Sequence, residues 1–345
     1  MGIASFLRGR FRLLLLLLGL ATAGLQAFVI WQIERQVLEP ANRHQGGLSV
    51  ADDFSAGTRA LDPEAFDRKW FSGHHAIKVP EPAATLHVWR FDPLHLQTDR
   101  EARATVLLIP GWGGTAMKSE YLFLLAQVLR VEGCRVFLVD LRGQGCSSGD
   151  TCSYGYLDAK DLTHLVNGMR RKNLIAGPVL LAGHSYGAIA AIQAAPVVPE
   201  VQGVMAFSGP KDLFAVADTA RQLASRTFPW LYPLVRPFFS DAAYRFAVTH
   251  AARRHGFEAE KSSALDAIGR FSGPVFIAHG DRDVDVPMSN AMALQQARPN
   301  DTELRLYPGA DHWSYLLKEA DLMPVRVWVK GVLDRQTTVR QKSSP

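Results

Sequence analysis

A serine flanked by two glycines lies between an apolar run and a run of small residues, and this pattern restricts the fold more than any other feature. Residues 178–182 are apolar, 183–187 read GHSYG, and 188–195 are rich in alanine. We predict a buried strand, a sharp turn at Ser185 and a helix. The glycines keep Cβ atoms away from a turn in which the serine adopts a strained conformation that exposes its Oγ. The alternative is a glycine-flanked serine that opens a Rossmann-like helix.

A serine hydroxyl is a poor nucleophile at neutral pH, so a reactive Ser185 requires a histidine base and a carboxylate. Three aspartates, Asp281, Asp283 and Asp285, follow an apolar run at 275–278. His312 follows a short alternating run that ends in Pro-Gly at 308–309. Three other histidines are candidates for the base. His184 lies beside the nucleophile, His279 lies at the end of a strand, and His250 belongs to a variable region.

Four motifs, in order, resemble the α/β-hydrolase superfamily and cover roughly residues 105–313. They are PGWGG at 110–114, DLRGQGCSSG at 140–149, GHSYG at 183–187 and HGDRDVDVP at 279–287, followed by a G-x-x-H ending at 309–312. The resemblance implies an α/β fold with a mostly parallel eight-stranded sheet and helices on both faces. It also implies a helical cap inserted at 209–273.

The resemblance implies a role for five residues. Ser185 is the expected nucleophile, Asp283 the acid and His312 the base, in the superfamily's order along the chain. The backbone N–H groups of Trp112 and Tyr186 are the expected oxyanion hole. Asp281 and Asp285 are then turn or capping residues.

Two further positions are interpreted as structural. Pro110 stands where relatives frequently carry a histidine that braces the loop. The substitution is expected to affect how the loop is held more than it affects catalysis. Arg142 is expected to bond neighbouring loop carbonyls, because a guanidinium offers five donors in one plane.

The closest resemblance is to the serine-aminopeptidase-like and monoglyceride-lipase-like branch of the superfamily. It implies hydrolysis of carboxylic esters through an acyl-enzyme intermediate, with no metal and no organic cofactor. Aminopeptidase, amidase or thioesterase activity with the same residues is the alternative. A binding protein that kept the fold without turnover is a third reading, but no member of the expected triad is missing. Serine at position 185 argues against a dehalogenase, which would need aspartate there.

Substrate selectivity is expected in the cap segment, which interrupts the alternation of strands and helices. The aromatic residues Phe214, Trp230 and Phe238 are candidates to line an acyl or aryl pocket. The alternative is that they seal the cap onto the core. The arginines of the cap either form a solvated face or include one that binds a substrate carboxylate: Arg221, Arg226, Arg236, Arg245, Arg253 and Arg254.

Residues 13–33 carry no ionised side chain and are long enough to span a bilayer as a helix. Arginines precede this stretch, so the positive-inside rule predicts a cytoplasmic N-terminus at 1–12 and an extracytoplasmic hydrolase domain. A signal peptide cleaved near Ala23 is the alternative, because 21–23 read ATA. We expect a linker at 34–72, the catalytic domain at 73–335 and a disordered tail at 336–345.

Charge and cysteine content exclude two classes of function. The net charge is +5, and no block of lysine and arginine with interleaved aromatics indicates nucleic-acid binding. The three cysteines lack zinc-site spacing. Cys146 and Cys152 could form a disulfide in an oxidising compartment, with Cys134 free. The expected partners are a small ester or amide substrate and, through 13–33, a lipid bilayer.

Overall fold

The computed structural model describes residues 24, 26–31, 33–39, 71–94, 102–114, 119–199, 201–219 and 240–343. Several predictions fall outside these residues. They concern the basic N-terminus at 1–12, the first half of the predicted membrane segment at 13–23, most of the linker, and the cap residues Trp230 and Phe238.

One eight-stranded sheet organises the described chain, with the strand order β1-β2-β4-β3-β5-β6-β7-β8. The hairpin β1–β2 and the β2–β4 pair are antiparallel, and the other pairs are parallel. The predicted mostly parallel sheet is therefore confirmed. Its strands are β1 Gly73–Val79, β2 Ala84–Phe91, β3 Ala104–Ile109, β4 Cys134–Asp140, β5 Val179–His184, β6 Val201–Phe207, β7 Val275–Gly280 and β8 Thr302–Tyr307.

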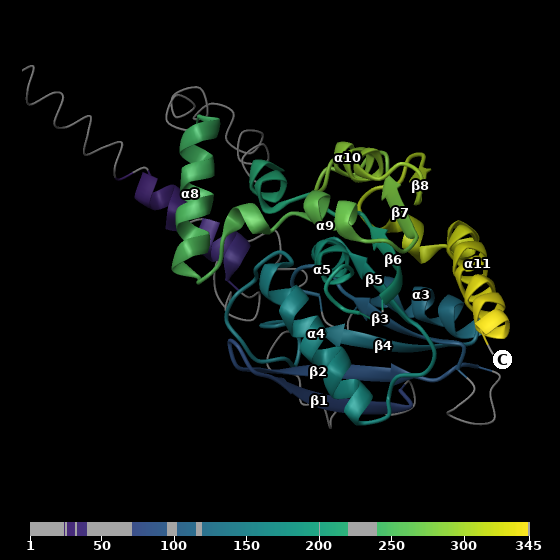
Figure 1. The fold of residues 1–345 in the computed structure, drawn as a ribbon. Helices are drawn as coiled ribbons and strands as arrows, with labels where there is room; N and C mark the ends of the chain where they lie inside the picture. Colours follow the sequence, from purple (N-terminus) through teal and green to yellow (C-terminus); the bar gives the residue numbers. More distant parts are fainter. Residues whose placement is uncertain are drawn as a thin grey trace, which may run out of the picture.

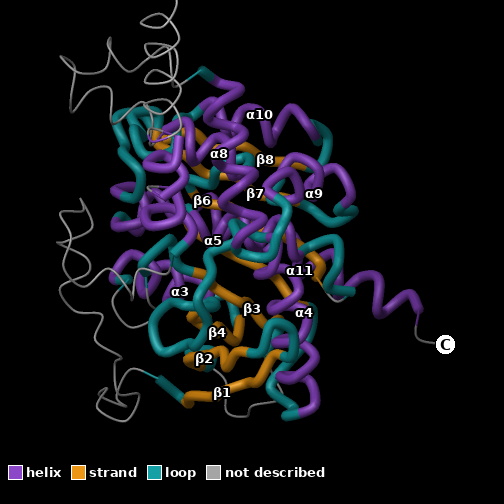
Figure 2. Tube along the Cα trace, turned by 90° about the vertical axis from the view of Figure 1, so that its left-hand side faces the viewer, coloured by secondary structure: helices purple, strands orange, loops and turns teal. Residues whose placement is uncertain are grey.

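Helices cover both faces of the sheet (Figure 1 and Figure 2). On one face lie α4, α5, α9 and α10, and on the other lie α3 and α11. β3 is buried along its whole length because Leu107 and Ile109 pack on the first face, while Val106 and Leu108 pack on the second. The helices are α3 Glu120–Val131, α4 Tyr156–Arg171, α5 Tyr186–Ala194, α8 Asp241–Arg254, α9 Ala264–Arg270, α10 Ser289–Ala297 and α11 Glu319–Ser343, with short helices η1 Glu34–Leu38, η5 Ala259–Lys261 and η6 Ser314–Leu317.

The last helix is longer than the sequence suggested. α11 continues to Ser343, so the prediction of a disordered tail is wrong for the backbone of 336–343. The segment after Gly331 contains neither glycine nor proline before Ser343. Adding residues to an existing helix requires no new nucleation, which explains why the helix extends this far.

The end of the predicted membrane segment and the first residues of the predicted linker pack on the catalytic domain. Ile33 and Leu38 are buried in the main core, and the backbone N–H of Cys152 donates to the carbonyl of Leu38 at 2.8 Å. Glu34 lies 3.2 Å from the guanidinium of Arg254 on α8, beside which η1 runs (Figure 1). Nowhere in the described part of the chain does a helix combine the length and apolarity that a bilayer span requires.

All three cysteines are free thiols, so the suggested Cys146–Cys152 disulfide is wrong. Cys152 is fully buried in the cluster under α4 and α5, whereas Cys146 packs against the cluster on the opposite face of the sheet. Burial raises the pKa of the Cys152 thiol. The two sulfurs therefore belong to different layers of the fold, although only five residues separate them in sequence.

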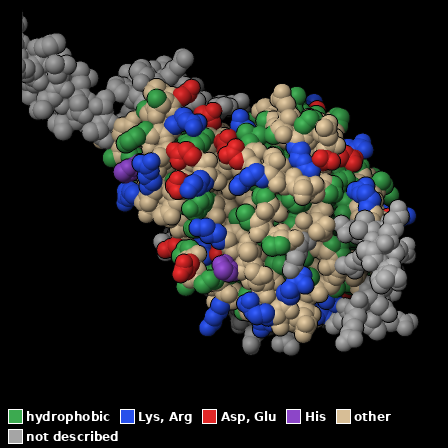
Figure 3. Space-filling model, in the orientation of Figure 1, with side chains coloured by type: hydrophobic (Ala, Val, Ile, Leu, Met, Phe, Trp, Pro, Cys, Tyr) green, Lys and Arg blue, Asp and Glu red, His purple; other side chains and the backbone are tan. Residues whose placement is uncertain are grey.

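Charged side chains of both signs are mixed over the visible surface, without a large field of one sign (Figure 3).

Arg142 is held mainly by a buried carboxylate, and only one of its hydrogen bonds goes to a carbonyl of a neighbouring loop, as predicted. Its guanidinium donates twice to Asp161, at 2.8 Å and 2.7 Å, and once to the carbonyl of Pro82 at 2.7 Å. Both charged side chains are 1% exposed. The pair with Asp161 ties the loop after β4 to α4, and the bond to Pro82 ties that loop to the β1–β2 turn.

Replacing Asp161 with alanine is expected to lower the free energy of unfolding by about 3–5 kcal/mol, because a buried guanidinium loses its counter-charge. Urea denaturation of the full chain would measure this loss. The control is Glu303→Ala, which breaks the largely solvated pair with Arg305 and is expected to cost about 0–1 kcal/mol. Equal losses in the two variants would contradict the argument.

Candidate active site

Ser185 occupies a sharp turn between β5 and α5. Its φ is 53° and its ψ is −114°, a backbone conformation that residues with a Cβ rarely adopt. A Cβ on Gly183 would clash with the backbone of Gly187, and a Cβ on Gly187 would clash with the backbone of Ile109. The backbone N–H of Ser185 donates to Phe207 on β6 at 2.8 Å, which fixes the turn. The predicted strand, turn and helix are therefore confirmed.

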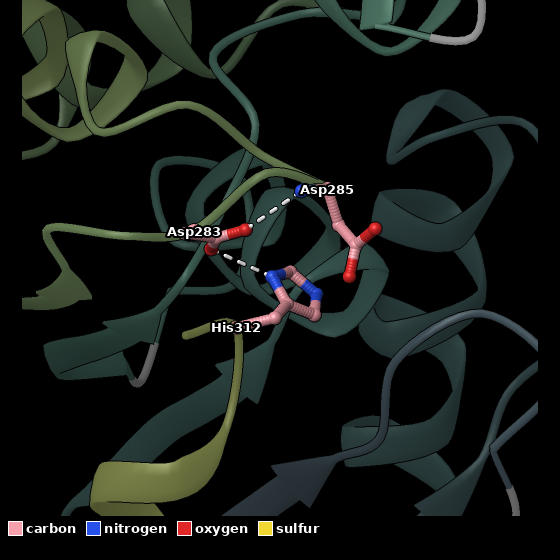
Figure 4. A group of neighbouring side chains, drawn as sticks. All are labelled: Asp283, Asp285 and His312. Carbon is pink, nitrogen blue, oxygen red and sulfur yellow. Dashed lines mark hydrogen bonds and ion pairs between the residues drawn. The ribbon is translucent and has the colours of Figure 1, made fainter. Parts of the chain in front are cut away.

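Asp283 and His312, which lie 29 residues apart in sequence, are hydrogen bonded. The Nδ1 atom of His312 lies 2.7 Å from Oδ2 of Asp283 (Figure 4). A carboxylate only accepts, so Nδ1 carries the proton and Nε2 is left with a lone pair. The loops after β7 and β8 carry the two residues, so adjacent parallel strands bring them together.

The other oxygen of Asp283 accepts two backbone N–H groups, from Asp285 at 3.0 Å and from Val286 at 2.8 Å. Burial would raise the pKa of Asp283, but hydrogen bonds from His279 and His312 outweigh it and hold the pKa well below its usual range. The carboxyl group is therefore an anion at neutral pH. An anion at this position fixes the imidazole of His312 in one tautomer.

His279, a rejected candidate for the base, is a second imidazole on this carboxylate. It is fully buried, with Nε2 2.7 Å from the carbonyl of Val286 and 3.2 Å from Oδ2 of Asp283. It therefore supports the acid and the turn that presents it. Its position at the end of a strand, directly before the acid loop, was the sequence signal for this role.

Asp283, Asp285 and His312 also place potential metal-ligand atoms within 4.8 Å of one another. The oxygens of Asp283 already accept hydrogen bonds from two N–H groups and from imidazole. A metal ion would have to replace these bonds. The group is better explained as an oriented acid–base pair, with Asp285 on its exposed side.

His184, the residue before Ser185, connects the turn to the loop of His312. Its Nε2 donates to the carbonyl of His312 at 2.9 Å, and the two ring centroids are 4.7 Å apart. Burial, with a smaller contribution from His312, lowers the pKa of His184 to about 3. His184 is thus a neutral donor that positions the base, and its Nε2 is unavailable for proton transfer from Ser185.

The protein is expected to lose stability as pH falls below 6.5, in part because of His184. The unfolded chain binds a proton at this histidine near pH 6.5, whereas the folded chain does so only near pH 3. The unfolded state therefore binds more protons in this window, so the free energy of unfolding decreases with decreasing pH. From pH 7 to pH 5 the His184 contribution is about 2 kcal/mol.

Urea denaturation at both pH values, for wild type and His184→Gln, measures this contribution as the difference between the two pH dependences. The glutamine keeps a donor for the carbonyl of His312 but does not titrate. An unchanged pH dependence in the variant would contradict the assignment.

The loop at 110–114 lies directly on the turn at Ser185. A Cβ on Gly111 would lie 3.3 Å from Cβ of Ser185 and 3.2 Å from Nδ1 of His184, so the two backbones are in close contact. Trp112 follows Gly111 in this loop. Tyr186 is the first residue of α5, where a backbone N–H has no partner inside the helix. Both predicted oxyanion donors therefore belong to segments that meet at Ser185.

A buried polar group that the sequence did not reveal anchors Tyr186. The hydroxyl of Tyr186 donates to Asp158 at 2.7 Å, and it accepts the backbone N–H of Ser153 at 3.1 Å. Asp158 also accepts the hydroxyl of Ser153 at 2.9 Å and the backbone N–H of Gly155 at 2.8 Å. This network fixes the first residue of α5. Asp158 and Tyr186 are 28 residues apart, and no local pattern pairs them.

Of the three predicted cap aromatics, only Phe214 belongs to the described residues. It is half-buried, and the guanidinium of Arg245 on α8 lies 3.9 Å from its ring centroid. It lines a cavity together with charged residues.

Comparison with known proteins gives relatives of two kinds. The chain is 28% identical over 282 residues to the monoglyceride lipase of Saccharomyces cerevisiae. The alignment covers 70% of this chain and 88% of the lipase. It is 32% identical over 141 residues to the epoxide hydrolase srdG of Neurospora crassa, in an alignment that covers 40% of this chain. The chain spans only 39% of the length of the epoxide hydrolase.

Solved structures show the same fold. An esterase of Pyrococcus furiosus matches with a TM-score of 0.56 at 19% identity, covering 84% of this chain and 95% of that one. Est1E of Butyrivibrio proteoclasticus matches with a TM-score of 0.52 at 17% identity, covering 77% and 100%. The model of the alpha/beta hydrolase family matches residues 106–323, more than half of the chain. The protein therefore belongs to the alpha/beta hydrolase family.

Proposed function

We propose that the protein is a membrane-anchored serine hydrolase that cleaves carboxylic esters. The observation that carries the proposal is the hydrogen bond of 2.7 Å between Asp283 and His312, whose loop is tied by His184 to the turn of Ser185. An ionised acid, an oriented imidazole and a serine on a strained turn are the groups that acyl transfer requires.

In the proposed mechanism, Oγ of Ser185 attacks the ester carbonyl while Nε2 of His312 takes the hydroxyl proton. Nδ1 of His312 stays hydrogen bonded to Asp283, which stabilises the imidazolium. The backbone N–H groups of Trp112 and Tyr186 bind the oxyanion. The proton then passes from His312 to the leaving alcohol, and an acyl group remains on Ser185.

Water completes the cycle. His312 takes a proton from a water molecule as the oxygen attacks the acyl carbon, and the proton returns to Oγ of Ser185 as the carboxylic acid leaves. Every proton that leaves Ser185 or water is thus accounted for. None of these steps calls for a group other than the chain, the ester and water.

We propose ester hydrolysis before the other activities because the proteins similar to this chain include a monoglyceride lipase and an esterase of known structure. Aminopeptidase, amidase or thioesterase activity with the same residues is the second candidate. Epoxide opening by Ser185 would leave an ether on the serine, and an ether is not readily cleaved by water. The likeness to an epoxide hydrolase therefore does not favour that reaction for this chain.

The proposal includes an anchor at 13–33, with residues 1–12 in the cytoplasm and the catalytic domain outside. The apolar length and the preceding arginines support it. Mass spectrometry of the mature protein tests it, because an N-terminus near residue 24 would instead show cleavage of a signal peptide at Ala23.

A fluorophosphonate probe tests the chemistry on the wild-type protein. We expect a covalent adduct on the peptide that contains Ser185. A parallel screen of p-nitrophenyl esters and aminoacyl anilides should give faster turnover with esters. Labelling of another serine would refute the assignment of the nucleophile, and faster turnover of anilides would favour an amidase or aminopeptidase.

A further inference from the structure

The turn that carries the proposed oxyanion donor Trp112 is closed by a backbone hydrogen bond. The N–H of Gly114 donates to the carbonyl of Gly111 at 3.0 Å, and Gly113 between them has a φ of 69°. The turn contacts the nucleophile directly, because a Cβ on Gly111 would lie 3.3 Å from Cβ of Ser185. A small shift of this turn would therefore move the N–H of Trp112 relative to Ser185.

A buried glutamine from another loop reaches both ends of this turn. Gln144 is 1% exposed, and one end of its side-chain amide faces only acceptors, the carbonyl oxygens of the turn. The NH₂ of an amide donates and its oxygen only accepts, so the NH₂ belongs on this side. It donates to the carbonyl of Gly111 at 3.1 Å and to that of Gly114 at 3.3 Å. Pro110, the residue before the turn, has no side-chain donor with which to hold it.

The loop that presents Gln144 is itself held by hydrogen bonds. The backbone N–H of Gln144 donates to the carbonyl of Leu141 at 3.0 Å, and its carbonyl accepts the N–H of Ser147 at 2.9 Å. The carboxylate of Asp140 accepts the backbone N–H of Cys146 at 3.0 Å. The amide therefore extends from a fixed backbone, as the support of a second loop requires.

We propose that Gln144 is a positioning residue of the oxyanion hole, which holds the turn at 111–114 so that the backbone N–H of Trp112 meets the oxyanion formed at Ser185. The inference rests on the proposed function and adds to it a residue outside the triad. Loss of one oxyanion donor lowers kcat by about 10²–10³-fold. Loosening the turn leaves the donor in place but less well aimed, so we expect a smaller loss, of about ten-fold.

The test compares Gln144→Met with wild type on p-nitrophenyl hexanoate and on its thionoester, in which sulfur replaces the carbonyl oxygen. Methionine has a similar length but no N–H donor. We expect kcat for the ester to fall about ten-fold, with KM within about two-fold of wild type. The thionoester should lose less than about three-fold, because sulfur is a weak acceptor and gains little from the N–H of Trp112. The ratio of the two kcat values should therefore fall.

Gln193→Met is the matched control. Gln193 is also a buried glutamine whose amide donates to a carbonyl, that of Tyr154 at 2.7 Å. This variant should lose a similar amount of stability in urea but keep the ester-to-thionoester ratio of wild type. If Gln144 had only a structural role, Gln144→Met would lower both rates by the same factor. An unchanged ratio in Gln144→Met would overturn the inference.

A crystal structure of the wild-type protein after reaction with a fluorophosphonate reads the geometry without any variant. We expect a phosphonyl oxygen within hydrogen-bond distance of the backbone nitrogen of Trp112, and the amide of Gln144 against the carbonyls of Gly111 and Gly114. A Gln144 side chain turned away from these carbonyls would overturn the inference, even if Gln144→Met did not fold. Failure of Ser185 to react, with no hydrolysis of either substrate by wild type, would refute the proposed function instead.

Discussion

Replacing Ser185 with alanine is expected to lower kcat for ester hydrolysis by about 10⁶-fold, the loss seen when a serine protease is deprived of its nucleophile. Without Oγ there is no acyl-enzyme, and only substrate binding and the oxyanion hole contribute. Alanine keeps the Cβ and so the same backbone preference at φ 53°, and the flanking glycines are unchanged. The fold should therefore be retained, as circular dichroism and urea denaturation would verify.

Ser208 provides a matched control for this variant. It follows β6, the strand next to β5, is fully buried, and has a φ of 49°. Its Oγ lies 2.9 Å from the hydroxyl of Tyr315 and has no part in the proposed chemistry. Ser208→Ala should reduce stability by about 1 kcal/mol through the lost hydrogen bond, because the hydroxyl of Tyr315 still donates to the carbonyl of Ala278 at 3.2 Å, and it should change kcat less than ten-fold. Similar losses of kcat in the two variants would indicate damage to the fold and not loss of a nucleophile.

Replacing Asp283 with asparagine is expected to lower kcat by about 10⁴-fold, as the equivalent change does in serine proteases. One oxygen of Asp283 accepts the backbone N–H groups of Asp285 and Val286, so the amide oxygen of asparagine should occupy that side. The amide NH₂ would then face His312. Nδ1 of His312 would have to accept, which moves its proton to Nε2 and removes the lone pair that serves as the base.

Steady-state kinetics and the rate of fluorophosphonate labelling measure this effect, and both should fall together. Asp281→Asn and Asp285→Asn are the controls. Asp281 accepts the backbone N–H of Gly309 at 2.7 Å on an exposed turn, and Asp285 is exposed. Each control should stay within about ten-fold of wild type. A loss in Asp285→Asn equal to that in Asp283→Asn would move the acid to residue 285.

The parts of the fold that local sequence determines could be predicted well. The strand, turn and helix around Ser185 follow from an apolar run, two glycines and a run of alanines, because steric exclusion of Cβ acts over a few residues. The mainly apolar run of β3, in which only Thr105 is polar, likewise predicts a strand buried on both faces. The choice among Asp281, Asp283 and Asp285 came from family resemblance, and the hydrogen bond to His312 agrees with it.

Contacts between distant segments could not be predicted from local pattern. His184 and the loop of His312 are 128 residues apart, and Asp158 and Tyr186 are 28 apart. Arg142 was assigned to loop carbonyls because the sequence does not show that α4 presents Asp161 to it. The suggested disulfide was wrong for the same reason. Cys146 and Cys152 are close in sequence, but the fold places them on opposite faces of one sheet.

The sequence by itself determined that a strained serine would stand between a strand and a helix, and that an aspartate and a histidine would follow later strands. Backbone sterics and hydrophobic periodicity decide such features within a short window. Only the tertiary structure decided which groups meet: His279 at the carboxylate, His184 at the base loop, and Gln144 at the turn of Trp112. These contacts depend on strand order and helix packing, which set the distances between residues that no local pattern links.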